Sequence, residues 1–370
     1  MLTEYFSLFQ ESPITPSAYS QARQYLSHTA FIELNRESVV KVVRRDGGKK
    51  FLGHRLLAID SSVIRLPESQ ELTDKFGSMA VSKDKGELGS YNSARSSVLY
   101  DVLNNIAISS FLEPIAVGEQ SLVAKHSVNL EDSDVVIMDR GYASYKVLCE
   151  VRRKGADFIC RTSTSSFKAV NEFISSSDTD KVISVFRPSS VDKKEPEQLL
   201  VRAVKVLLST GEVETLITSL TDQEKYKTDD FQELYGLRWG IETFFHRLKS
   251  RLNLENFTAK TAEGVKQDFY ATIFVSNLES ILTEDADEVL AQKTTQHPQK
   301  VNSTVSFHAI KTHVLALLFS NIPSAQVIAE LNQIFLRNTT SSRPHRGSKN
   351  RLTSPNKQAN FYRRRYKPVF

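Results

Sequence analysis

Two short stretches of the chain are apolar without a break, and each stops at an aspartate. Residues 56–59 precede Asp60, and residues 135–138 precede Asp139. A continuous apolar run of this length is typical of a strand that is buried on both faces, as in a sheet covered by helices. Segments with helical apolar spacing alternate with these runs, so the pattern predicts an α/β fold.

Changes in texture along the chain predict six segments. From residue 166 to residue 221, runs of serine and aspartate separate short β-rich stretches, which we interpret as an insertion between two parts of one core. The predicted organisation is an N-terminal helical segment at 1–45, a core at 46–165 and 222–285, the insertion at 166–221, C-terminal helices at 286–336, and a basic, disordered tail at 337–370.

A long amphipathic helix is predicted at residues 235–252. At about 100° per residue, four of its polar residues fall in a stripe about 60° wide, beside a sector of large apolar side chains. These four are Tyr235, Arg238, Glu242 and Lys249. The helix is therefore expected to pack one face on a core and to carry these groups along its edge. The alternative is a solvated face with an Arg238–Glu242 pair, which would stabilise the helix by only a few tenths of a kcal/mol.

Two strand-terminal aspartates and one helical glutamate form a candidate catalytic set. Residues just beyond the carboxyl ends of strands line the functional crevice of an open α/β sheet, and a later helix could bring Glu242 beside Asp60 and Asp139. Three carboxylates within ~4 Å of one another would repel by roughly 4 kcal/mol per pair near a protein surface. Such a set is tolerable only if it is protonated, separated or bridged by cations.

The donor atoms of this set suit a hard cation. Carboxylate oxygens with no nearby cysteine or histidine pair favour Mg²⁺ or Mn²⁺. Two such ions ~3.5–4 Å apart would hold the attacking and leaving oxygens of a phosphodiester displacement. The other polar residues of the helix stripe would then donate to DNA phosphates.

The charge of the chain is concentrated at its end. The formal net charge is +5, but no acidic residue follows Glu330 and ten basic residues do, so the rest of the chain carries 5 − 10 = −5. The ten are Arg337, Arg343, Arg346, Lys349, Arg351, Lys357, Arg363, Arg364, Arg365 and Lys367. Arginines beside aromatic residues suit phosphate contact, so the tail is interpreted as nucleic-acid binding, with a solubilising end as the alternative.

Several classes of protein are excluded by what the sequence lacks. No apolar run reaches about 18 residues, so a membrane-spanning helix is not expected. No basic region precedes an apolar stretch at the start, so no secretory signal is expected. No glycine-rich phosphate-binding motif occurs, so no nucleotide cofactor is expected. Cys149 and Cys160 lie in apolar stretches and are predicted to be buried thiols in a reducing compartment.

The spacing Tyr-x₂-Arg-x₃-Glu-x₆-Lys, with two aspartates upstream, resembles the signature of DDE transposases of bacterial insertion sequence family 4. The surrounding residues are similar too: LLAIDSSVIRLP around Asp60, VVIMDRGY around Asp139, and RWGIETFFHRLKSRLNLENFTAKTAEGVKQDFYATIFVSNL from Arg238. The resemblance extends over residues 17–282, and it implies a ribonuclease H-like catalytic core with a β-rich insertion before the glutamate helix.

The same resemblance assigns roles to individual residues. Asp60, Asp139 and Glu242 would be both the catalytic residues and the ligands of two Mg²⁺ or Mn²⁺ ions. Contacts to DNA are expected from Tyr235, Arg238, Lys249, Trp239 and Arg140. For Trp239 the expected contact is stacking on an unpaired base, with ordinary packing as the alternative.

The implied function is that of a DNA transposase. A metal-bound water would cleave a strand at the end of the mobile element, and the freed 3′-hydroxyl would then attack, either the opposite strand or the target. The partners would be double-stranded DNA and a second protomer, in the bacterial cytoplasm with the nucleoid. Two alternatives remain: a non-catalytic DNA-binding protein derived from a transposase, favoured by the short segment before Ser17, and a nuclease that only hydrolyses.

Overall fold

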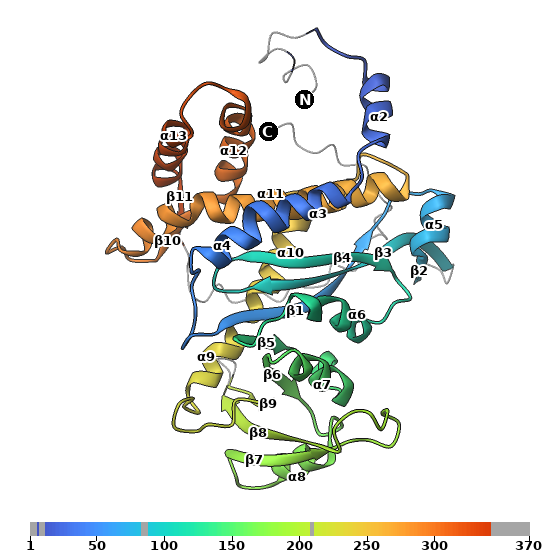
Figure 1. The fold of residues 1–370 in the computed structure, drawn as a ribbon, viewed down its shortest axis with the longest axis vertical. Coiled ribbons are helices and arrows are strands. Elements are labelled where there is room, and N and C mark those ends of the chain that lie inside the picture. The colour runs from blue at the N-terminus through green and yellow to red at the C-terminus, as the bar shows by residue number, and fades with distance from the viewer. Residues whose placement is uncertain (1–5, 7–11, 83–87, 208–210, 342–370) are drawn as a thin grey trace. The chain divides into compact units, whose positions relative to one another are not determined.

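The computed structural model describes residue 6 and residues 12–82, 88–207 and 211–341 (Figure 1). The chain divides into two compact units, each described here by itself. The sheet unit comprises residues 40–64 and 93–246. The helical unit comprises the described parts of 1–39, 65–92 and 247–370.

Parallel strands form the centre of the sheet unit. β1 (Arg55–Arg65) pairs in parallel with β5 (Asp134–Met138), and β5 pairs in parallel with β6 (Asp157–Thr162). On the other side of β1 comes β3 (Leu88–Asp101), which pairs antiparallel with β4 (Ile106–Pro114). The order β4-β3-β1-β5-β6 is that of a ribonuclease H-like core, so the predicted fold class is confirmed.

The two apolar runs of the sequence are the buried centres of β1 and β5. Each side chain of residues 56–59 is at most 2% exposed, and each of residues 135–138 is at most 1% exposed. Successive residues of a strand point to opposite faces, so unbroken burial means that both faces of these strands are covered. The absence of alternation in the sequence follows from that burial.

Short helices pack beside these strands. α6 (Glu119–His126) contacts α7 (Tyr145–Arg153), and α7 contacts β6. The buried His126 ring of α6 makes hydrogen bonds with Ser97 of β3 (3.0 Å) and Ser109 of β4 (2.7 Å). These bonds satisfy both ring nitrogens and fix α6 on the sheet.

The predicted β-rich insertion continues the same sheet. β9 (Val213–Thr218) pairs antiparallel with β6, followed by β8 (Gln198–Leu207) and β7 (Asp180–Phe186), as Figure 1 shows. α8 (Lys168–Ser175) packs on β7. The described residues of this segment therefore add three strands and one helix to the core.

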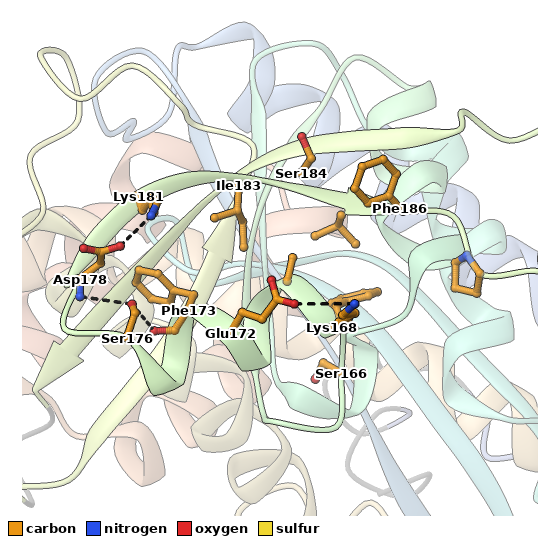
Figure 2. Close-up of a pocket in the computed structure, with 14 residues that line it drawn as sticks. Ser166, Lys168, Glu172, Phe173, Ser176, Asp178, Lys181, Ile183, Ser184 and Phe186 are labelled. Atoms are coloured by element: carbon orange, nitrogen blue, oxygen red, sulfur yellow. Dashed lines mark hydrogen bonds and ion pairs between the residues drawn. The ribbon is translucent and has the colours of Figure 1, made fainter.

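A cavity of about 680 Å³ lies between α8 and β7 (Figure 2). Phe173 and Ile183 are among its apolar lining residues. The four charged residues that line it pair with one another: Lys168 with Glu172 (3.9 Å) and Lys181 with Asp178 (2.8 Å). The charged side chains of this cavity are therefore already matched within its own lining.

The helical unit is built on α11 (Ala262–Ala291), a helix of 30 residues. α3 (Thr29–Asn35) runs along it, and α12 (Ser303–Phe319) packs with α13 (Ser324–Arg337) near its end (Figure 1). Leu290, Ile310, Leu331 and Phe335 are members of the apolar cluster that joins these last three helices.

The remaining described elements are short. They are α2 (Pro16–Gln24), the π-helix η1 (Arg36–Val40), α4 (Lys41–Arg45), α5 (Gln70–Phe76), β2 (Ser78–Ser82), the 3₁₀ helix η2 (Ser127–Asn129), β10 (Gln299–Val301) and β11 (Thr339–Ser341). β2 pairs antiparallel with the first residues of β3. None of the described helices is long and apolar enough to cross a membrane.

The basic tail begins later than residue 337. Thr339–Ser341 forms β11 and pairs antiparallel with β10, so these residues are ordered rather than part of a disordered tail. The predicted tail from residue 342 on, with nine of its ten basic residues, lies outside the described residues. Its role in nucleic-acid binding stays a prediction. Cys149 and Cys160 are free and buried, as predicted.

Candidate active site

Asp60 lies within a strand and not at its end, contrary to the prediction. β1 continues five residues beyond it to Arg65, because the segment after Asp60 contains β-branched residues, and Ile64 among them is 0% exposed. The prediction for Asp139 is confirmed, since β5 ends at Met138.

The two aspartates nevertheless share the register of the two strands. β1 and β5 pair with a constant offset, which for Ala58 and Ile137 is 137 − 58 = 79. Asp60 and Asp139 keep the same offset, 139 − 60 = 79, two residues beyond the last pair, Ala58 and Ile137, so the register directs both aspartates to the same edge of the sheet. Adjacent strands lie about 4.8 Å apart, which allows both carboxylates to act on one ligand.

Short hydrogen bonds hold both aspartates. Asp60 Oδ1 accepts from the Ser61 backbone N–H (2.7 Å), and Asp139 Oδ1 accepts from the Gly141 N–H (2.8 Å). The second bond caps the 3₁₀ helix η3 (Arg140–Tyr142). The buried Tyr142 hydroxyl lies 3.3 Å from the Ser61 hydroxyl, which links this turn to β1.

The predicted single helix at 235–252 is wrong. α9 (Asp230–Gly236) ends before Arg238, and α10 (Trp239–Ser250) begins after it. Between them, the Arg238 N–H donates to the Tyr235 carbonyl and the Ile241 N–H to the Arg238 carbonyl, both at 3.1 Å and both with 3₁₀ spacing. Glycine is a weak helix former, and Gly236 ends α9. Helix angles therefore do not carry over from Tyr235 to Glu242.

Arg238 is buried at this break and pairs with Glu242. Its side chain is 7% exposed, and Nη2 lies 2.7 Å from Glu242 Oε1. The guanidinium centre lies 4.9 Å from the Trp239 ring centroid and 5.7 Å from that of Tyr235, both within reach of a cation–π contact. The pair weighed as an alternative is thus present, but with a buried arginine instead of a solvated one.

The three acidic residues influence one another. Burial, with contributions from Asp139 and Glu242, raises the pKa of Asp60 to about 6, against the opposing effect of Arg238. Their oxygen-only donor set suits a hard divalent cation. No group of three acidic, histidine or cysteine side chains within the described ranges stands at metal-holding distances, and the Glu242 carboxylate is engaged by Arg238.

Residues 52–278 match the model of the Transposase DDE domain family. The chain belongs to this family. It is 22% identical over 270 residues to the Escherichia coli K12 transposase InsG of insertion sequence element IS4, covering 72% of this chain and 60% of that protein. It thus spans about three-fifths of that relative's length. All residues named above in the site lie within the matched range.

Two further proteins are similar over different lengths. The Escherichia coli transposase of insertion sequence element IS421 is 41% identical over 70 residues, which are 19% of this chain and 18% of that protein. The piggyBac transposase in a synaptic complex with hairpin DNA covers 81% of this chain and 60% of its own, with 9% identity and a TM-score of 0.42.

The other predicted contact residues of this DDE family member lie in varied surroundings. Trp239 is 58% exposed, and Arg140 is exposed. Tyr235 is only 3% exposed, and within the described part of the chain its hydroxyl has no hydrogen-bond partner. Lys249 belongs to the helical unit, where its Nζ lies 3.9 Å from Glu255 Oε1 and burial lowers its pKa.

Glu119 is a residue near the site that the sequence interpretation missed. A Cβ placed on Gly141 would lie 2.9 Å from Glu119 Oε1 and 3.0 Å from Asp139 Oδ1. The two oxygens are therefore at most 2.9 + 3.0 = 5.9 Å apart. The only signal in the sequence is the glycine of the Asp139-Arg140-Gly141 stretch, whose hydrogen leaves room for both carboxylates.

Asp60→Asn is expected to stabilise the metal-free chain above pH 6 and to have little effect at pH 4. The Asp60 carboxyl has a pKa of about 6 in the folded chain and 3.8 in the unfolded chain, so the folded state holds its proton more tightly. The stability that this proton confers is fully present below pH 3.8 and is lost as the pH rises through about 6. The difference between these values corresponds to about 3 kcal/mol at most. Urea denaturation in EDTA at pH 4 and pH 8 would measure it. An equal gain at both pH values would show that charge is not the cause.

Proposed function

We propose that this chain is a DNA transposase whose metal-dependent site consists of Asp60, Asp139 and Glu242. The observation that carries the proposal is the parallel register of β1 and β5, because Asp60 and Asp139 share its constant offset within the matched family range. The effect of Glu242 on the pKa of Asp60 supports including the third carboxylate.

The DDE family uses a divalent metal. In this chain, the carboxylates of Asp60, Asp139 and Glu242 would bind two Mg²⁺ or Mn²⁺ ions. When bound, these ions would lower the pKa of an attacking water and neutralise charge on the phosphoryl oxygens. The protein's own part is to position its ligands. The backbone N–H groups of Ser61 and Gly141 fix the two aspartates, and Arg238 holds Glu242 until DNA is bound.

DNA would be bound by cationic and aromatic groups around this site. Arg140 and Trp239 are exposed, which suits a phosphate contact and stacking on an unpaired base. Arg238 would exchange its bond to Glu242 for one to a phosphate. Tyr235 is proposed as a further contact of this unit, and Lys249 as a separate DNA contact of the helical unit. The DNA would comprise the ends of a mobile element and its target, held by two protomers.

Cleavage and joining can be tested on one substrate. A labelled duplex made from the inverted repeats that flank the gene is incubated with the full chain and Mg²⁺ or Mn²⁺. We expect nicks at the repeat boundary, no cleavage in EDTA, and joined products when pre-cleaved ends are supplied. Hydrolysis without joining would indicate a nuclease. Binding without cleavage under all metal conditions would indicate a non-catalytic DNA-binding protein.

A further inference from the structure

A second cavity of about 680 Å³ opens between the first turns of α6 and α7, beside β3. Its polar lining includes Arg95, Glu119, Gln120, Ser144, Lys146 and Glu150. One wall is tied to the proposed active site, because Gln120 Nε2 donates to the Gly141 carbonyl (2.6 Å) and Gly141 bonds to Asp139. A ligand in this cavity would therefore lie next to the turn that carries Asp139.

The start of α7 has unused hydrogen-bond donors. The first N–H groups of a helix have no partner within the helix, and they favour anions together with the helix dipole. Ser144 stands at the N-cap position, but its side chain makes no capping bond. Its hydroxyl is buried and has no hydrogen-bond partner among the described residues. This buried, idle hydroxyl is an observation separate from the helix end itself.

Two cations of the cavity also lack acidic partners within the described ranges. Lys146, in the first turn of α7, is exposed and makes no ion pair. Arg95 has a buried Nε without an acceptor, and its Nη2 makes only a long bond of 3.4 Å to the Ile115 carbonyl. A buried charged donor without an acceptor is unfavourable, so the arrangement points to an acceptor from outside the chain.

The two carboxylates of the cavity are directed to other groups. Glu150 is paired with Arg153 and accepts a hydrogen bond from Ser127 Oγ (2.7 Å). Glu119 lies against Gly141, next to Asp139. By contrast, the cavity of Figure 2 has its cations matched by its own acids. The cavity at α7 instead combines unmatched cations with idle donors.

We propose that this cavity binds a phosphate group of the DNA backbone through Lys146, Arg95, Ser144 and the first turn of α7. The proposal rests on the proposed function and extends it. The phosphate belongs to the DNA strand that passes the Asp139 turn, at a short distance from the bond that is cut. The site positions the duplex and reads no sequence, since its donors face a phosphate and not a base edge.

The test is a binding measurement in which cleavage plays no part. A fluorescent duplex is titrated with the full chain in EDTA at several salt concentrations, and anisotropy is recorded. Lys146→Ala is expected to weaken binding about 5–10-fold and to lower the slope of log K against log salt by about one. Lys154→Ala, at the other end of α7 and also exposed, is the matched control and should change neither value.

Replacing single phosphates of the DNA with an uncharged linkage identifies the phosphate that the cavity binds. Methylphosphonates are introduced one at a time along the duplex, and we expect one position to weaken binding by the wild type but not by Lys146→Ala. Ser144→Ala, which removes only an unpaired hydroxyl, should fold normally and show a smaller loss of the same kind. Equal salt slopes for Lys146→Ala and Lys154→Ala would overturn the phosphate site alone. A wild type that binds no duplex would overturn the proposed function as well.

Discussion

Glu242→Gln is expected to lower the rate of metal-dependent DNA cleavage by about 10³-fold, while the affinity for duplex DNA changes little. The change keeps the shape of the side chain but removes the charge that a divalent cation requires. Single-turnover cleavage of a labelled duplex in Mg²⁺ and in Mn²⁺ would measure the rate. Anisotropy in EDTA would measure binding.

Glu233→Gln is the matched control for this experiment. Glu233 is exposed on α9, and it undergoes the same chemical change at a position outside the proposed site. We expect it to cleave at the wild-type rate. Mn²⁺ binding followed by electron paramagnetic resonance gives a second readout, in which only Glu242→Gln loses affinity. A Glu242→Gln protein with wild-type cleavage and Mn²⁺ affinity would exclude Glu242 from the site.

The sequence predicted the strands of the core well, because their burial is recorded directly in their composition. Unbroken apolar runs at 56–59 and 135–138 reflect strands covered on both faces. The end of the run at Asp60 was misread as the end of the strand. An apolar run ends where two-sided burial ends, whereas hydrogen bonding in β1 continues to Arg65.

The helix break at Arg238 was hidden from the pattern for a different reason. A short 3₁₀ stretch changes the angle between the side chains before it and those after it. It does not change which residues are apolar, so the hydrophobic pattern does not reveal it. The polar stripe was therefore drawn across a discontinuity. The conclusion that Arg238 and Glu242 lie close together survived, because a four-residue spacing brings side chains together across this turn as well.

Glu119 could not have been found from local pattern at all. It stands at the start of α6, where an acidic residue is ordinary because it complements the helix dipole. Its nearness to Asp139 arises only when α6 packs against the turn after β5, with Gly141 between them. The cavity at α7 depends on the same contact between distant segments. Such sites require the tertiary structure.

Arg202→Met is expected to destabilise the chain by about 3–5 kcal/mol, the usual cost of removing one member of a buried ion pair. Arg202 is 1% exposed on β8. Its Nε donates to Asp180 Oδ1 (2.8 Å), and its Nη1 donates to the Tyr226 carbonyl (2.7 Å). The methionine would leave Asp180 and that carbonyl short of donors. Urea denaturation of the metal-free protein would measure the loss.

The same pair connects stability to the proposed site. Tyr226 lies four residues before the start of α9, and the Arg202 guanidinium lies 5.0 Å from the ring of Phe231 within α9. Loss of this contact would weaken the packing of α9, the helix that leads to Arg238. The cleavage rate should therefore fall even where the variant remains folded. Lys181→Met, which removes an exposed pair on β7, should cost less than about 1 kcal/mol. If both variants lost equal stability, the buried pair would not be what holds α9 to the sheet.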